Sequence, residues 1–273
     1  MNNITIEENP KIKNVKIYPI QSHLFIPPIV WRGDPEGHIG ENDTFFYVTE
    51  GEIGLFIEED GYILRSGDLA FLPKGKRRAY TTLSDTVSLY EINFGAQIND
   101  MPWHKALRLE EKNYSVHPSD EAAIRTLFES SVRYELNKLP CYDIVFCANI
   151  ALLISIYADI RKNEQRLIQP FGAAERFMKE NIGRSISLTE LSEVSFTEST
   201  YFIRKFKAAY GLSPIAYFNK MKIYRAMFLL CSTNLSVFDI AKEIGVQDSS
   251  YFTRLFKSVT SVTPSEYRHS FAK

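Results

Sequence analysis

YFIRKFK at residues 201–207 and YFTRLFK at residues 251–257 are two copies of one pattern, separated by 50 residues in a chain of 273. The same offset aligns Ser213-Pro214 with Thr263-Pro264, so the similarity extends beyond the two heptapeptides. A solenoid needs about three or more repeats, so two copies indicate a duplicated supersecondary unit. This repeat decides the fold of the C-terminal part of the chain.

Each copy has the sequence pattern of a helix-turn-helix unit. A short apolar helix is expected at Leu188–Val194 in copy one and at Val237–Ile244 in copy two. A tight turn follows, in which Gly245 lies in copy two and Ser195 takes its place in copy one. A second, amphipathic helix then begins. Helix-turn-helix folds place this second helix in the major groove of DNA.

The second helix of each copy begins after an acidic residue, Glu198 or Asp248. Aspartate is a strong N-cap and glutamate a weaker one, so Thr197 is an alternative cap in copy one. At about 100° per residue, Phe202 and Phe206 point together toward a core, and copy two repeats this arrangement.

The opposite face of each second helix carries hydroxyl and basic residues. Small hydroxyl side chains allow close approach to DNA, an arginine can fork onto guanine, and a lysine can meet a phosphate. The alternative is the solvated face of an ordinary amphipathic helix, which the duplication within a basic domain makes the weaker interpretation. The predicted DNA contacts are Ser199, Thr200, Ile203, Arg204, Lys207, Ser249, Ser250, Thr253, Arg254 and Lys257, with Arg204 and Arg254 reading bases.

The net charge of −1 averages over two unlike parts of the chain. From Phe171 onward there are 14 Lys and Arg against 9 Asp and Glu, a net of +5, whereas the preceding residues have a net of −6. Such asymmetry is a weak indication of a nucleic-acid-binding segment beside a different domain.

A longer pattern runs from Ala241 through Gly245 and Asp248 to Tyr267-Arg268. Because of this pattern, the C-terminal hundred residues resemble the AraC/XylS family of bacterial transcription regulators. Two positions depart from the family pattern: Val246 stands where the family usually has Phe, and Ser261 where it usually has Gly.

The resemblance implies two helix-turn-helix subdomains joined by one long helix, here at about Ile215 to Leu230, that is roughly 24 Å long. It also implies a homodimer that binds double-stranded DNA at a promoter or operator, and contact with RNA polymerase if the protein is an activator. We expect an activator that responds to a small molecule.

The N-terminal half is predicted to be antiparallel β. Its apolar runs are separated by Glu50-Gly51, Asp60-Gly61 and Ser66-Gly67-Asp68, which supply the positive φ that tight hairpins need. Many short strands at this spacing indicate a sandwich or a barrel. The predicted strands are Val15–Ile20, Phe45–Thr49, Ile53–Ile57, Tyr62–Leu64, Leu69–Leu72 and Val87–Phe94.

GDLAFLPKG at residues 67–75 resembles the second motif of cupin barrels, the ligand-sensing domains of many such regulators. Metal-binding cupins carry a histidine where this chain has Arg78. In the first motif only His38 is in register, with Gly40 and Thr44 at the other positions. One histidine and no carboxylate cannot build a metal site of roughly three or more ligands. We therefore expect no enzyme activity, no catalytic residue, no metal and no cofactor.

A barrel without metal ligands could hold a small molecule at its mouth. Arginine and glutamate beside aromatic rings would suit a sugar, another polyhydroxyl compound or an anion. The alternatives are that residues 76–78 form a solvated basic loop and that the barrel serves only dimerisation or protein contact. The predicted effector-binding residues are Arg32, His38, Arg78, Tyr80 and Glu91.

Two helices are expected between the halves, one from Ser119 as N-cap to Lys138 and one at about Tyr142 to Lys162, separated by Pro140. The second is apolar nearly all round, so it needs two partners. One is the barrel. By resemblance the other is a second subunit, although burial of both faces within one monomer is the alternative. The polar residues 163–170 are expected to form a linker.

The whole chain is predicted to be an α+β protein of the cytoplasm. We see no secretory signal, and the most apolar run, Ile144–Ala158, is shorter than the ~20 residues of a membrane span. Three cysteines without framework or metal spacing suit a reducing compartment. The predicted units are an effector-binding domain at 1–118, a helical dimerisation and linker region at 119–165, and a DNA-binding domain at 166–273.

Overall fold

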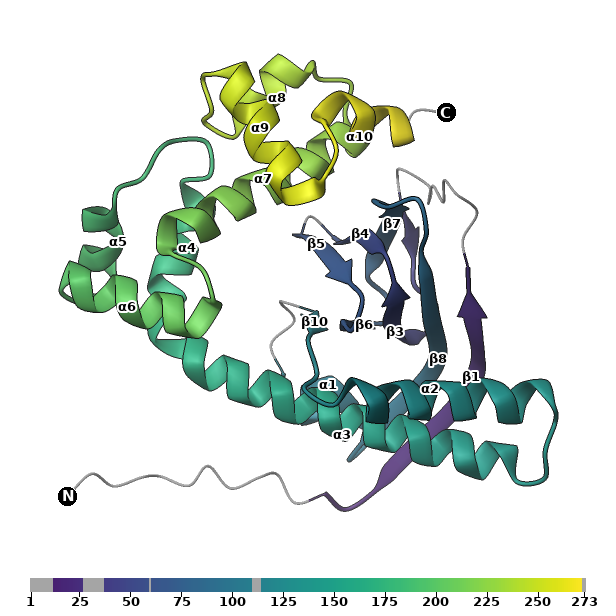
Figure 1. Cartoon of the computed structure of the whole chain (residues 1–273). Helices are drawn as coiled ribbons and strands as arrows, with labels where there is room; N and C mark the ends of the chain where they lie inside the picture. The colour runs from purple at the N-terminus through teal and green to yellow at the C-terminus, as the bar shows by residue number, and fades with distance from the viewer. Residues whose placement is uncertain (1–11, 27–36, 59, 110–113, 272–273) are drawn as a thin grey trace, which may run out of the picture.

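The computed structural model describes residues 12–26, 37–58, 60–109 and 114–271. Antiparallel sheets come first along the chain, two long helices cross beneath them, and the C-terminal domain is helical (Figure 1). The α+β prediction is confirmed.

Within the described residues, the N-terminal half forms two antiparallel sheets. The first has the order β1-β8-β3-β6-β10, with β9 paired to β8, and the second has the order β2-β7-β4-β5. The first sheet contains β1 (Val15–Phe25), β3 (Asp43–Glu50), β6 (Leu69–Leu72), β8 (Ser88–Ile98), β9 (Met101–Pro102) and β10 (Ser115–Val116). The second contains β2 (His38–Ile39), β4 (Glu52–Ile57), β5 (Asp60–Arg65) and β7 (Arg77–Thr82).

The two sheets face each other, and in the described ranges no strand of one pairs with a strand of the other. The expected barrel is therefore not closed. Gly51 and Gly67 do have positive φ, +79° and +90°, but their turns carry the chain from one sheet to the other. Gly61 does not lie in a turn, because it falls inside β5. Tight turns that switch sheets produce a sandwich rather than a continuous ladder.

Strand β7 was not among the predicted strands. It begins at Arg77, so residues 77 and 78 belong to a sheet and not to a solvated loop. Its neighbours are β2 and β4, and the register places Arg78 opposite His38 and Ile57. The strand was missed because its basic and threonine residues hide the alternation that an apolar strand would show.

The helices α2 (Glu121–Leu136) and α3 (Tyr142–Ile168) cover the outer face of the first sheet (Figure 1). The ring of Phe128 stacks on Tyr47 and Tyr90, with centroids 5.7 and 5.9 Å apart. The N-cap of α2 is Asp120 and not Ser119, because the Asp120 carboxylate accepts a hydrogen bond from Ala123 N.

The prediction that residues 163–170 form a linker is wrong. Helix α3 continues to Ile168, and the 3-10 turn η1 (Gln169–Phe171) leads directly into α4 (Gly172–Glu180). Arg161 pairs with Glu164 one turn along the helix, so polar residues here support a helix rather than interrupt it.

Among the described helices, α3 is long and apolar enough to cross a membrane by length and composition. Phe146, Ile150 and Leu153 are instead buried against the sheets as part of the N-terminal core. The helix thus packs as a core helix on one side.

In the described part of the C-terminal domain, two helical groups are joined by a long helix, α7. Phe202 and Phe206 belong to one apolar core, and Phe252 and Phe256 belong to a second one, which also includes residues of the N-terminal half. The helices are α5 (Leu188–Val194), α6 (Ser199–Tyr210), α7 (Pro214–Ser232), α8 (Val237–Glu243), α9 (Ser249–Thr260) and α10 (Pro264–Phe271), and a short α1 (Trp103–Ala106) lies in the N-terminal half.

Candidate nucleic-acid interface and effector site

The helices α6 and α9 begin with the same acidic cap. The Glu198 carboxylate accepts hydrogen bonds from Thr200 N and Tyr201 N, and Asp248 accepts from Ser250 N and Tyr251 N. The acidic caps are confirmed, and the alternative cap Thr197 is wrong. These backbone hydrogen bonds also lower the pKa of Glu198.

The buried and exposed faces of α6 and α9 match in the two copies. Phe202 and Phe206 are fully buried, as are their counterparts in α9, which confirms the predicted inward face. The side chains of Arg204, Lys207, Thr200, Arg254, Lys257, Ser249 and Ser250 are exposed.

Three of the ten predicted DNA-contact residues are only partly exposed. Ile203 packs against the first core, and Thr253 is half-buried. The Ser199 hydroxyl lies 2.8 Å from the hydroxyl of Ser192 on α5, so it joins the two helices of the first unit. On α6, Tyr201 supports the outward face, because the Arg204 guanidinium lies 5.7 Å from the centre of its ring.

The turns between the paired helices differ from the prediction. Phe196 has φ +51° and Gly245 has φ +69°, and both amides bond to the carbonyl three residues earlier. The next amides, of Thr197 and Val246, bond five residues back. Phe196 therefore takes the place of Gly245, and Ser195 does not. The first helices are offset by 49 residues and the second by 50, because the copy-two turn is one residue longer.

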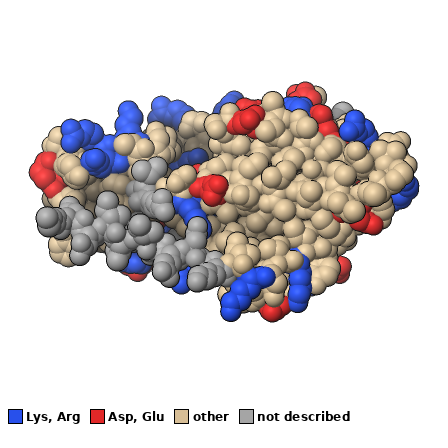
Figure 2. Space-filling view, turned by 90° about the horizontal axis from the view of Figure 1, so that it is seen from below, with Lys and Arg blue, Asp and Glu red and all other residues tan. Residues whose placement is uncertain are grey.

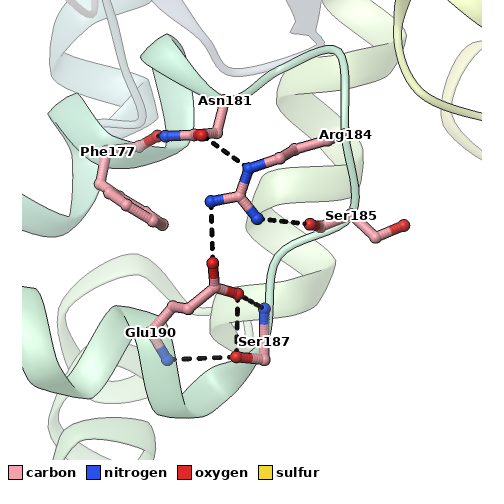
Figure 3. A network of polar contacts seen from close by, with 6 residues as sticks. All are labelled: Phe177, Asn181, Arg184, Ser185, Ser187 and Glu190. Atoms are coloured by element: carbon pink, nitrogen blue, oxygen red, sulfur yellow. Dashed lines mark hydrogen bonds and ion pairs between the residues drawn. The ribbon is translucent and has the colours of Figure 1, made fainter.

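An arginine anchors the start of the first unit (Figure 3). Arg184 donates to Asn181 Oδ1 at 2.7 Å and to the Ser185 carbonyl at 2.9 Å, and pairs with Glu190 at 2.8 Å. Glu190 also accepts from Ser187 N, completing a capping box at the N-terminus of α5. The Arg184 guanidinium, followed by the Ser187 hydrogen bonds, lowers the pKa of Glu190 to about 2.

The two units touch where Gly183 meets Gly245. A Cβ on Gly245 would lie 2.5 Å from the carbonyl carbon of Gly183, so only glycine fits. Lys222 of α7 is buried beside this contact and reaches the Gly245 carbonyl at 3.5 Å, and burial lowers its pKa to about 8. This contact fixes how the two units sit relative to each other.

A chain of polar side chains crosses the space between the two sheets. Arg78 of β7 donates to the Thr44 hydroxyl at 2.9 Å, and that hydroxyl donates to Asn93 Oδ1 at 2.7 Å. Asn93 donates to Glu91 at 2.7 Å, and Glu91 lies 3.4 Å from His23 Nε2. Arg78 is only 7% exposed, so a buried cation is held here by the Thr44 hydroxyl, with the negative charges of Glu91 and Asp43 nearby.

The series of polar side chains continues near the first residues of β7. His38 Nε2 lies 3.3 Å from Arg78 Nε and 3.3 Å from the Tyr80 hydroxyl. A Cβ on Gly40 would meet the Arg78 guanidinium at 2.6 Å, so this glycine makes room for it. Arg32 lies outside the described residues. We call the seven side chains of His23, His38, Thr44, Arg78, Tyr80, Glu91 and Asn93 the inner polar cluster.

The structure brings together four of the five predicted effector residues and adds three. Burial lowers the pKa of Arg78 and raises that of Tyr80 to about 12, so the phenol stays a neutral donor. Glu91 and Asn93 alternate with apolar residues in β8, a signal that could have marked Asn93 as inward-facing. His23 could not be placed from sequence because β1 has a bulge between Pro19 and Gln21. In the described ranges, no group of three or more metal-ligating side chains is present.

Comparison with known proteins agrees with this geometry. Residues 191–270 match the family described as a helix-turn-helix domain. The chain is 25% identical over 252 residues to the uncharacterized HTH-type transcriptional regulator YdiP of Escherichia coli K12, covering 86% of this chain and 81% of that protein. It is 23% identical over 270 residues to the raffinose operon transcriptional regulatory protein RafR of Pediococcus pentosaceus, covering 90% of each.

Among solved structures, the C-terminal domain of AraT, a response regulator from Geobacillus stearothermophilus, is similar at 27% identity. It has a TM-score of 0.37 and covers 38% of this chain and 88% of that one. The chain is a helix-turn-helix transcription regulator. Its DNA-binding domain is of the AraC type.

Proposed function

We propose that this protein regulates transcription by reading a specific DNA sequence with α6 and α9. The observation that supports this most is the match between the two helices. Each exposes one arginine and one lysine at equivalent positions over a buried phenylalanine pair. At ~1.5 Å per residue, the 19-residue α7 is roughly 28 Å long, which suits recognition helices in grooves about 34 Å apart.

Arg204 and Arg254 are assigned to base readout, with the remaining predicted contacts at the phosphates or groove edges. The test begins with duplexes selected by the protein from a random library. Arg254→Ala should weaken binding to the selected site by about 1–3 kcal/mol and relax the preference at one base position. Arg133→Ala, which removes an exposed arginine from α2, is the matched control. Unchanged affinity and unchanged site preference in Arg254→Ala would contradict the assignment.

The inner polar cluster is proposed to bind a small polyhydroxyl effector, a sugar or a related metabolite. Alternating donors and acceptors on neighbouring strands suit vicinal hydroxyl groups. The names of two relatives, the raffinose operon transcriptional regulatory protein and the lactose operon transcription activator of Staphylococcus xylosus, support a sugar-responsive activator. An activator of this kind would contact RNA polymerase. Calorimetry with a panel of sugars and carboxylates tests this. No heat from any member, with DNA binding intact, would favour a regulator without an effector.

A homodimer through α3 is proposed on the basis of its outer face. Ile144 and Leu152 are 69% and 51% exposed, and Ala148 and Ala151 lie exposed between them. Figure 2 views the side on which α2 and α3 lie and shows a broad area with few charged side chains. Light scattering should give a dimer for the full chain and a monomer for Leu152→Asp. A monomeric wild-type chain would contradict the proposed homodimer.

We also propose that this DNA-binding regulator works in the cytoplasm.

A further inference from the structure

Strand β7 has two faces that serve different parts of the molecule. Arg78 and Tyr80 point between the sheets and belong to the inner polar cluster. Successive side chains of a strand point to opposite faces, so Ala79 and Thr81 point the other way. Ala79 packs against the apolar core of the second helix-turn-helix unit, and the Thr81 methyl lies beside Gly54 on the same face.

The outer face of the second sheet and the second helix-turn-helix unit share one apolar core. Phe56, Ile63 and Leu83 of the N-terminal half are buried in the same cluster as Met227 and Leu230 of α7. The first unit differs, because its core includes no residue of the two sheets, over the part of the chain that the structure describes. The second unit is therefore attached directly to the sheet that holds Arg78.

Two glycines bring the helices close to this sheet. A Cβ on Gly54 would meet the Tyr267 hydroxyl of α10 at 3.4 Å, and a Cβ on Gly61 would meet Tyr224 Cβ of α7 at 3.3 Å. The ring of Phe56 lies 6.4 Å from that of Phe228. A close-packed contact of this kind transmits small displacements because it has few voids to absorb them.

We propose that β7 couples occupancy of the inner polar cluster to the position of the second helix-turn-helix unit. This rests on the proposed effector role of the cluster. A ligand that draws Arg78 and Tyr80 toward itself displaces Ala79 and Thr81 on the same backbone, and the contact with α7 and α10 must adjust. The base contacts of α9 then change before those of α6. The unit that contains α6 is connected to the N-terminal half through α3 and α4.

The experiment uses a substitution inside the cluster in place of an unidentified ligand. Arg78→Met perturbs the inner face in the full chain, and Phe56→Ser weakens the outer contact from the sheet side. Phe228→Ser weakens it from the helix side, so the test survives if one of the two fails to fold. Arg65→Met, at an exposed arginine paired with Glu52, is the matched control.

Hydrogen exchange and DNA affinity are the two measurements. Arg78→Met should speed amide exchange in α8 to α10 and change affinity for the selected duplex by about fivefold or more. The change in affinity should depend on bases in the half-site read by α9. In the Phe56→Ser or Phe228→Ser background, Arg78→Met should alter neither measurement beyond about twofold. Arg65→Met should alter neither in any background.

An equal effect of Arg78→Met in all backgrounds, or no effect in the wild-type chain, would overturn the coupling. Its failure is distinguishable from failure of the proposed function, because exchange is measured without ligand or DNA. If a sugar binds and changes DNA affinity equally in Phe56→Ser, the effector role stands and the route through β7 is wrong. If exchange is coupled and no sugar binds, the route stands and the effector assignment is wrong.

Discussion

Phe196 occupies in the first helix-turn-helix unit the left-handed position that Gly245 occupies in the second. The two residues have φ of +51° and +69° and make the same backbone hydrogen bond to the preceding helix. Glycine adopts this conformation freely, whereas a residue with a Cβ is strained by roughly 1–2 kcal/mol. The Phe196 side chain is 97% exposed, so it makes no core contact that offsets the strain.

Replacing Phe196 by glycine should therefore stabilise the protein. We expect a gain of about 0.5–1 kcal/mol, because relief of strain exceeds the greater chain entropy of glycine in the unfolded state. Urea unfolding of the full chain measures it. Phe238→Gly, which places glycine in the first turn of α8, is the control and should be destabilising. A Phe196→Gly protein less stable than wild type would show that Phe196 makes a contact that the structure does not display.

Gly245→Ala should be destabilising for two separate reasons. The positive φ costs about 1–2 kcal/mol, and the new methyl would overlap the Gly183 backbone. Gly211→Ala is the matched control, because Gly211 has φ +71° and open space around its Cβ. The difference between the two losses in unfolding free energy isolates the contact between the units. Equal losses would mean that Gly183 moves aside without cost.

The stability supplied by Glu190 should depend on pH in a defined direction. Its pKa falls from 4.5 to about 2 on folding, so its contribution is fully present above about pH 4.5 and is lost as pH falls through about 2. Glu190→Gln should lower the melting temperature near neutral pH, and the difference from wild type should shrink toward about pH 2. Glu180→Gln, the same change at an exposed glutamate of α4, serves as control. A constant difference at all pH values would contradict the role of the carboxylate.

Lys257 is expected to contact a phosphate rather than a base. Lys257→Gln should weaken binding to specific and unrelated duplexes by similar factors. The slope of log affinity against log salt concentration should lose about 0.9, the value of one phosphate contact on B-DNA. Anisotropy titrations over a range of salt measure both. A loss confined to the selected sequence would place Lys257 among the base-reading residues.

The helices of the DNA-binding domain were predictable because their signals are local. Leu188–Val194 was predicted with the bounds that the structure has, from apolar spacing and flanking polar residues. The turn was not, because a one-residue difference in length cannot be located when Ser195, Phe196 and Gly245 share no residue type. Strand β7 and the continuation of α3 past Lys162 were missed because both depend on tertiary contacts that override local polarity.

The residues proposed to bind an effector show the same difference between local and non-local signals. His38, Arg78, Tyr80 and Glu91 were found through their register with a known motif, and the structure brings them together. Asn93 joins them because β3 and β8 pair with Thr44 opposite Asn93, which is a non-local fact.

Only the three-residue turn η1 separates α3 from α4, so the number of residues in α3 sets the angle at which the first helix-turn-helix unit is held. Each residue added to a helix turns everything beyond it by about 100° and advances it by about 1.5 Å. A flexible linker would absorb one extra residue, whereas α3 would swing the first helix-turn-helix unit around its axis and pull α7 away from the sheet on which it is anchored (Figure 1). Insertions here should therefore be tolerated in whole turns, at about three or four residues, and rejected at one or two.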